Sequence, residues 1–176
     1  MSFGAPSADF HQWTIGPDET RAVVVRALEL GVNFIDTANC YAHGTSEEYI
    51  GAALRELGVP RDQMVLASKV FFNEGGLSRE AISREIDGTL ARLQTDYLDL
   101  YIIHRFDYAT PSRRRWRRST ASCARARCVP WARARCAHQL HNMQDVAEKN
   151  GWTPFSSAQI HYNPALPRGR ARDDSR

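Results

Sequence analysis

Amphipathic segments alternate with apolar runs along the first hundred residues of the chain. Each amphipathic segment carries apolar residues at helical spacing, and each apolar run is long enough for a buried strand. The helix–strand pairs are 17–31 with 32–41, 46–58 with 64–72, and 77–94 with 96–104. Continuous apolar strands alternating with amphipathic helices indicate an α/β fold with a parallel sheet.

The ends of the predicted helices carry recognisable signals. Ser46 and Ser78 each stand just before a helical pattern, where a hydroxyl caps free backbone N–H groups. Gly31 and Gly58 stand where the patterns of the first two helices stop, as glycine does at many helix ends. These signals predict compact helices joined to the strands by short loops.

The glycine pattern favours a barrel over a nucleotide-binding doubly wound sheet. No GxGxxG motif follows any of the predicted strands, and Gly75 and Gly76 lie in the loop-like stretch NEGGLS. We therefore expect part of a (β/α)8 TIM barrel. In such barrels the chemistry gathers at the C-terminal ends of the strands.

Four side chains stand at or just after the ends of the predicted strands. Asp36 and Tyr41 follow the first strand, Lys69 ends the second, and His104 ends the third. Each alone also fits a structural role: a turn aspartate, a packed tyrosine, a surface lysine with a buried stem, or a half-buried histidine. The parallel strands bring them to one edge, so together they suggest a shared site.

These four residue types can build a general-acid site. A tyrosine hydroxyl, with a pKa near ~10, is a weak acid at neutral pH, and a neighbouring lysine ammonium stabilises its phenolate. An aspartate keeps the lysine charged and oriented, and a neutral histidine can orient a carbonyl oxygen toward the tyrosine. Such a site needs only a hydride donor to reduce a C=O group.

Several segments in order resemble the aldo-keto reductase family. They are NFIDTANCYAHGTSEEYIGAALRE, VLASKVFF, GLSREAISREIDGTLARLQTDYLDLYIIHRFD and NGWTPFSSAQIHYN. The resemblance implies Tyr41 as the proton donor, with Lys69, Asp36 and His104 completing a catalytic tetrad.

The same resemblance implies the ligands of the site. Gln159 matches a glutamine that contacts the nicotinamide carboxamide, and Asp36 lies at the same cofactor site. It implies NADPH, with NADH not excluded, and a small aldehyde or ketone as substrate. Within the family, these segments most resemble the branch of glyceraldehyde-type reductases and potassium-channel β subunits. Because that branch includes channel subunits, a non-catalytic, nucleotide-binding partner protein is the alternative.

The resemblance divides the chain into unequal parts. Residues 1–111 and 137–163 are similar to the family barrel from the end of its first strand to its sixth strand, which would leave the barrel unclosed. Residues 112–136 and 164–176 do not follow the family pattern. We therefore expect an impaired fragment, truncated at both ends, in which residues 112–136 are poorly ordered.

The stretch 112–136 differs sharply in composition from the rest of the chain. It contains 9 arginines and no Lys, Asp or Glu, whereas the remainder has 14 basic and 20 acidic residues. Arginines beside Trp116 and Trp131 leave a nucleic-acid-binding segment as a lesser alternative. Zinc ligation by Cys123, Cys128, Cys136 and a nearby His138 or His141 lacks the tight CxxC pairs of common sites. We expect neither nucleic acid nor metal.

A shifted reading frame explains this stretch better than a ligand does. Permitted codons for residues 111–120, read from the third base, encode VEETMEALH, and the codons that continue through residues 121–135 into Cys136 encode GVVRAGKVRAVGASSM. The tail after Asn163 similarly yields LLYREDEREMIP. We hypothesise that a base was lost near Pro111, two more were lost near Cys136, and one was gained after Asn163.

The remaining features place the chain among ordinary soluble proteins. Outside the arginine-rich stretch the only cysteine is Cys40, so no disulfide framework is suggested. No secretory signal and no bilayer-spanning apolar run is visible, which favours the cytoplasm. The oligomeric state is left open.

Overall fold

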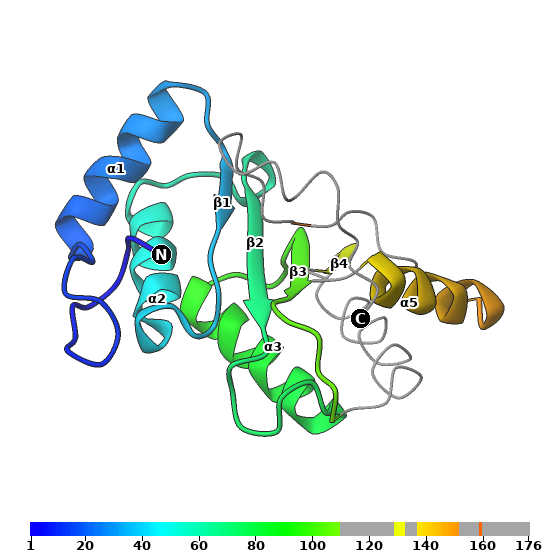
Figure 1. Cartoon of the computed structure of the whole chain (residues 1–176). Helices are drawn as coiled ribbons and strands as arrows, with labels where there is room; N and C mark the ends of the chain where they lie inside the picture. The colour runs from blue at the N-terminus through cyan, green and yellow to red at the C-terminus, as the bar shows by residue number, and fades with distance from the viewer. Residues whose placement is uncertain (110–128, 133–136, 152–158, 160–176) are drawn as a thin grey trace, which may run out of the picture.

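The computed structural model describes residues 1–109, 129–132, 137–151 and 159. They form an α/β structure around a four-stranded sheet with the order β1-β2-β3-β4, and all neighbouring strands are parallel (Figure 1). The strands are β1 Phe34–Asp36, β2 Val65–Val70, β3 Leu100–Ile103 and β4 Val129–Ala132. The predicted α/β class and parallel sheet are confirmed. Within the described residues the sheet is not closed.

Helices alternate with the strands along the chain, and within the described residues one helix connects β1 to β2 and the next connects β2 to β3. They are α1 Pro17–Glu29, α2 Thr45–Glu56, α3 Arg79–Leu93 and α5 Ala137–Lys149, with short 3-10 turns η1 Tyr41–Gly44 and η2 Arg61–Gln63. Among the described residues, no helix is both long and apolar enough to cross a membrane.

One predicted helix cap is confirmed and one is wrong. The Ser78 hydroxyl accepts a hydrogen bond from the Ala81 N–H at the start of α3. Ser46 does not cap α2, because that helix already begins at Thr45 after Gly44. The Ser46 hydroxyl is instead buried, 3.1 Å from the Thr37 hydroxyl. Polar side chains of α2 therefore face the sheet.

The core lies between the sheet and the helices that cover it. Side chains from α2, α3, β2 and β3 are buried there, and Val24 joins them from α1. β2 is deeply buried, since every residue from Leu66 to Val70 is buried. Its fully buried members include a lysine, Lys69, at its carboxyl end. A charge in such a position needs partners.

The first strand departs from the sequence prediction in its burial. Residues 32–41 were expected to contain a buried strand, but Val32 is exposed and Phe34 is 45% exposed. β1 pairs with β2 on one side and has no described strand on the other. An edge strand lacks the neighbour that covers one side of a central strand. The prediction of a strand is therefore confirmed, and the prediction that it is buried is wrong.

β4 lies inside the arginine-rich stretch. Residues 129–132 pair in parallel with β3, with Leu100 opposite Val129 and Ile103 opposite Ala132. No strand was predicted there in the given frame, so β4 is an addition to the sequence-based picture. The other residues of 112–136 lie outside the described part of the chain.

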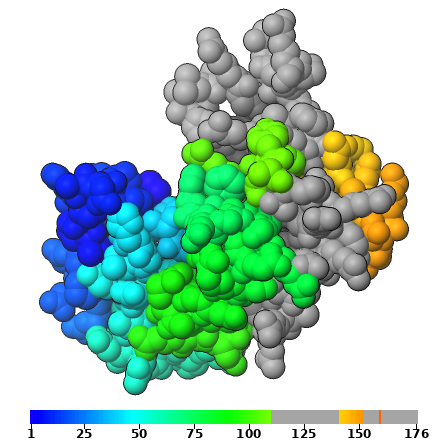
Figure 2. All heavy atoms as spheres, turned by 90° about the horizontal axis from the view of Figure 1, so that it is seen from below, coloured from blue at the N-terminus to red at the C-terminus, as the bar shows by residue number. Residues whose placement is uncertain are grey.

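The N-terminal residues pack against the turn that follows β1. Ala5 donates its N–H to the Thr45 hydroxyl at 2.8 Å, and Figure 2 shows the dark blue N-terminal segment beside the cyan surface around α2. Gly4 has φ +125°, and a Cβ on it would lie 2.4 Å from the Cβ of Ala42. Only glycine permits this close approach. The N-terminal segment therefore supports the Tyr41 turn from outside.

Candidate active site

Lys69 is the centre of the polar cluster at the carboxyl end of β2. The residue is 1% exposed. Its ammonium donates to Asp36 Oδ1 at 2.7 Å, to the Thr37 carbonyl at 2.9 Å and to the Tyr41 hydroxyl at 3.2 Å. An ammonium has three donors, so each of them has an acceptor. The alternative of a surface lysine with a buried stem is wrong.

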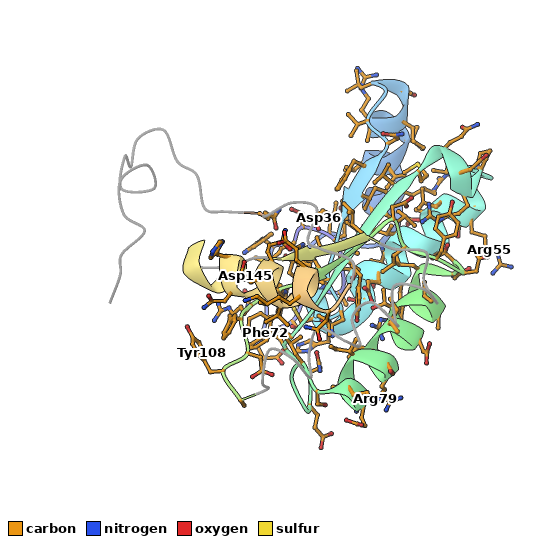
Figure 3. All side chains as sticks on the ribbon, turned by 90° about the vertical axis from the view of Figure 1, so that its right-hand side faces the viewer. Asp36, Arg55, Phe72, Arg79, Tyr108 and Asp145 are labelled. Atoms are coloured by element: carbon orange, nitrogen blue, oxygen red, sulfur yellow. The ribbon has the colours of Figure 1, made fainter. Side chains whose placement is uncertain are left out.

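Asp36 reaches Lys69 because β1 and β2 continue to pair beyond the end of β1. The Thr37 N–H donates to the Ala67 carbonyl, and the Asn39 N–H donates to the Lys69 carbonyl. This extended pairing places the Asp36 carboxylate beside the end of β2 (Figure 3). Its side chain is 29% exposed, so the ion pair lies at the mouth of the cluster. Asp36 can therefore face both Lys69 and a ligand.

Tyr41 opens a turn with an unusual backbone. It is buried, and the next three residues, Ala42, His43 and Gly44, all have positive φ angles of 46°, 55° and 94°. Non-glycine residues rarely take such angles, so the surrounding contacts must hold the turn in place. The Thr45 hydroxyl does so by donating to the Ala42 carbonyl. The turn aims the phenol at Lys69.

His104 brings the third strand into the cluster. It follows β3 directly, and its N–H donates to the Val70 carbonyl. Its ring meets the Tyr41 ring edge to face with centroids 5.7 Å apart, and the Phe72 ring at 5.0 Å. The structure thus brings Asp36, Tyr41, Lys69 and His104 together.

Cys40 is a neighbour of the cluster that the sequence interpretation did not assign to it. Its Sγ lies 3.9 Å from His104 Nδ1, and burial raises the pKa of the Cys40 thiol. A thiol with a raised pKa stays protonated at neutral pH and is a poor nucleophile. The Cys40 thiol is therefore not activated as a nucleophile.

Phe72 and Asn39 were also missed by the sequence interpretation. Phe72 is half-exposed beside His104, and the Arg105 guanidinium lies 4.8 Å from its ring centroid. Asn39 donates from its side chain to Asn73 Oδ1 at 3.2 Å and to Glu85 Oε2 at 2.8 Å. For Phe72 the available signal was an apolar run that continues past the end of β2. For Asn39 no sequence pattern indicated its partners.

Other predicted ligands are only partly covered by the described residues. Gln159 is half-buried and lies outside the helices and strands, and its neighbours on both sides are not described. Its contact with a cofactor stays a prediction. Cys123, Cys128 and Cys136 lie outside the described residues. Within the described part, no group of three or more His, Cys, Asp or Glu side chains is arranged to hold a metal ion.

The comparison with known proteins gives one family. The model of the aldo/keto reductase family matches residues 1–176. An aldo-keto reductase of Alternaria alternata is 31% identical over 194 residues, covering 93% of this chain and 52% of that protein. The versiconal hemiacetal acetate reductase of Aspergillus parasiticus is 31% identical over 188 residues, covering 93% of this chain and 54% of that protein.

A second kind of relative matches a shorter region. A probable voltage-gated potassium channel subunit beta of Oryza sativa subsp. japonica is 41% identical over 98 residues, covering 53% of this chain and 30% of that protein. The chain spans about half the length of the fungal reductases that it matches.

Proposed function

Because the chain belongs to the aldo-keto reductase family, we propose that it reduces the carbonyl group of an aldehyde or ketone with a nicotinamide cofactor. The observation that carries this proposal is the contact of one buried ammonium, Lys69 Nζ, with both Asp36 Oδ1 and the Tyr41 hydroxyl. A cation held against a phenol oxygen favours loss of the phenol proton. That is the property a proton donor to a carbonyl oxygen requires.

Each member of the tetrad has a distinct part in the proposed reaction. Tyr41 gives its hydroxyl proton to the carbonyl oxygen as negative charge develops there, and the Lys69 ammonium stabilises the phenolate that remains. Asp36 keeps the ammonium charged and in place. His104, whose ring stands edge-on to the Tyr41 ring, orients the carbonyl oxygen. General-acid catalysis of this kind contributes roughly 10²–10⁴-fold in rate.

The side-chain chemistry of Asp36, at the mouth of the cluster, and of Gln159 suits a nicotinamide. When bound, the cofactor supplies a hydride to the carbonyl carbon. A carboxamide both donates and accepts hydrogen bonds, and the partly exposed Asp36 carboxylate and the half-buried Gln159 amide offer matching groups. We assign these two residues to the carboxamide. The family generally uses NAD(P)H, and we propose NADPH for this chain.

A direct test follows NADPH oxidation by the purified chain with a simple aromatic aldehyde. The matched variant is Tyr41→Phe, which keeps the ring and removes the hydroxyl. We expect measurable turnover by the wild-type chain. Turnover that disappears in Tyr41→Phe supports the proposal. Equal rates for both proteins would refute it.

The channel-subunit relatives favour a second candidate function. A stretch of 98 residues is 41% identical to a plant potassium channel β subunit, a higher identity than either fungal reductase shows. The chain would then bind nucleotide as a non-catalytic partner protein. Saturable NADPH binding without any Tyr41-dependent turnover would select this candidate over the reductase.

A further inference from the structure

Glu47 is a buried carboxylate that the proposed reaction does not use. It lies in the first turn of α2 and is 0% exposed. One carboxylate oxygen accepts from Arg92 Nε at 2.7 Å, and the other accepts from the Ser68 hydroxyl at 2.5 Å. Arg92 belongs to α3 and Ser68 to β2, so a single side chain joins three elements.

The three-way contact connects the two segments that carry the proposed acid and its cation. Ser68 precedes Lys69 on β2, and Glu47 follows the Tyr41 turn at the start of α2. The carboxylate therefore ties the Tyr41 segment to the Lys69 strand on the helix-facing side of the sheet. The phenol and the ammonium meet on the other side, at 3.2 Å.

A second set of contacts, beside Glu47, also joins the start of α2 to the strand ends. The Ser46 and Thr37 hydroxyls lie 3.1 Å apart, and the Thr37 carbonyl accepts from the Lys69 ammonium at 2.9 Å. Both links hold the start of α2 against the strand ends. The turn between β1 and α2 has positive φ angles at Ala42 and His43, so it would not keep Tyr41 in place by its own preference.

We propose that Glu47 is a positioning residue for the Tyr41–Lys69 pair, acting through Ser68 and Arg92. This inference rests on the proposed carbonyl reduction. A buried ion pair is a weak source of net stability, because well-packed apolar side chains often replace it without loss. Its place between α2, β2 and α3 is explained by geometry: it fixes the distance between the phenol and the ammonium.

The apolar replacement separates positioning from folding. The triple variant Glu47→Met, Ser68→Ala, Arg92→Met removes all three polar partners together and leaves no buried charge alone. We expect it to fold, with kcat reduced about 10²-fold, since small misplacements of reacting groups cost that much. KM and the NADPH dissociation constant should stay within about twofold of the wild-type values.

Two further variants keep the test decisive if the triple variant fails to fold. Ser68→Ala removes only the link to β2 and should lower kcat in the same direction. Asp99→Asn is the matched control, because the Asp99 carboxylate also bonds an arginine, Arg61, and β2, but at the opposite end of the strand. It should leave kcat unchanged.

A readout independent of turnover follows the Tyr41 ring itself. In the chain labelled with ¹³C at tyrosine Cζ, the Tyr41 signal is the one that Tyr41→Phe removes. We expect that signal to shift or broaden in the triple variant and in Ser68→Ala, and to stay in place in Asp99→Asn. If the wild-type chain shows no turnover and the signal still moves, the reductase proposal fails and the positioning role stands. An unchanged Tyr41 signal and unchanged kcat in folded Glu47 and Ser68 variants would overturn the inference.

Discussion

The two ends of β2 hold similar ion pairs in different surroundings. At the amino end, Arg61 donates to the Asp99 carboxylate at 2.7 Å, to the Thr95 hydroxyl and to the carbonyls of Met64 and Tyr97. At the carboxyl end, Lys69 donates to the Asp36 carboxylate, also at 2.7 Å. The bond length of the pair therefore does not distinguish a structural site from a chemical one.

The two cations differ in the acceptors that they bond besides the paired carboxylate. All other acceptors of Arg61 are backbone carbonyls or the Thr95 hydroxyl, and its guanidinium covers the Tyr97 ring. The Lys69 ammonium instead donates one hydrogen bond to the Tyr41 hydroxyl, a group that can itself lose a proton. In Figure 3, Asp36 lies near the middle of the view, whereas Arg55 and Arg79 point outward from their helices. This contact between a cation and an ionisable hydroxyl is the basis for proposing the carboxyl end as the reactive end.

The largest expected effect is on turnover at the carboxyl end. Tyr41→Phe should lower the rate of NADPH-dependent aldehyde reduction by roughly 10²–10⁴-fold, the usual contribution of a general acid. Tyr97→Phe is the matched variant at the amino end, where the hydroxyl bonds only weakly, at 3.5 Å to the Arg61 carbonyl. Its turnover should equal that of the wild-type chain. Similar losses in both variants would remove the distinction between the two ends.

The next effect is on stability at the amino end. Arg61→Met leaves the Asp99 carboxylate and two backbone carbonyls without their charged donor, and should cost about 2–4 kcal/mol in the free energy of unfolding. Urea denaturation followed by circular dichroism measures this cost. The folded fraction should keep wild-type kcat. A large fall in kcat would show that the amino end also takes part in the chemistry.

A smaller effect on turnover distinguishes the Asp36 carboxylate from the Asp99 carboxylate. Asp36→Asn keeps an acceptor for Lys69 but removes the charge, and charge-assisted hydrogen bonds exceed neutral ones by about 1–1.5 kcal/mol. We expect turnover to fall about tenfold. The corresponding Asp99→Asn variant should lower the free energy of unfolding and leave kcat unchanged. The pair of kcat values, measured side by side at saturating aldehyde, decides whether charge matters at one end only.

The smallest effect concerns the thiol beside the tetrad. Burial raises the pKa of Cys40, so its reaction with iodoacetamide should stay slow at pH 8 and accelerate only at higher pH. The stability that the buried thiol contributes is present below the unfolded-state pKa and is lost as pH rises through the folded-state pKa. The folded chain should therefore be less stable at pH 10 than at pH 8, and Cys40→Ala should reduce that difference.

The labelling experiment uses a variant in which Cys123, Cys128 and Cys136 are serine, so that Cys40 is the single thiol. Mass spectrometry at timed intervals gives the rate at each pH. Rapid modification of the folded variant at pH 7 would show an activated thiol and contradict the raised pKa of Cys40.

Local sequence signals were sufficient for the first three helices and the first three strands, and for the expectation that the four candidate side chains lie together. Helical spacing and the Ser78 cap predicted α3, and the end of each apolar run placed Asp36, Lys69 and His104 at one edge. This works because parallel strands align their carboxyl ends whatever lies between them. The contacts of Lys69 then follow from the register of β1 and β2.

Features that depend on distant partners could not be predicted. Phe34 is exposed because no described strand covers that side of β1, and a strand pattern does not say which neighbour it will have. Glu47 sits in an ordinary helix start, and its partner Arg92 is 45 residues away. The positive φ angles of Ala42 and His43 fall on residues that give no glycine signal. Tertiary packing, rather than local preference, decides these three features.

The arginine-rich stretch remains the least predictable part of the chain. β4 falls at residues 129–132, where the shifted reading frame also encodes a strand. The frameshift hypothesis stays a prediction. Resequencing the coding DNA across Pro111, Cys136 and Asn163 tests it, and stop codons in the alternative frame would end the hypothesis.

Hydride transfer to a carbonyl, with Tyr41 as proton donor, is the claim on which the rest depends. The most direct measurement incubates the chain with an aromatic aldehyde and NADPH that carries two deuterons at C4, and weighs the alcohol product by mass spectrometry. The wild-type chain should yield alcohol with a single deuterium at the former carbonyl carbon, and Tyr41→Phe should yield none above background. Equal deuterium transfer by both proteins, or none by either, would contradict the account.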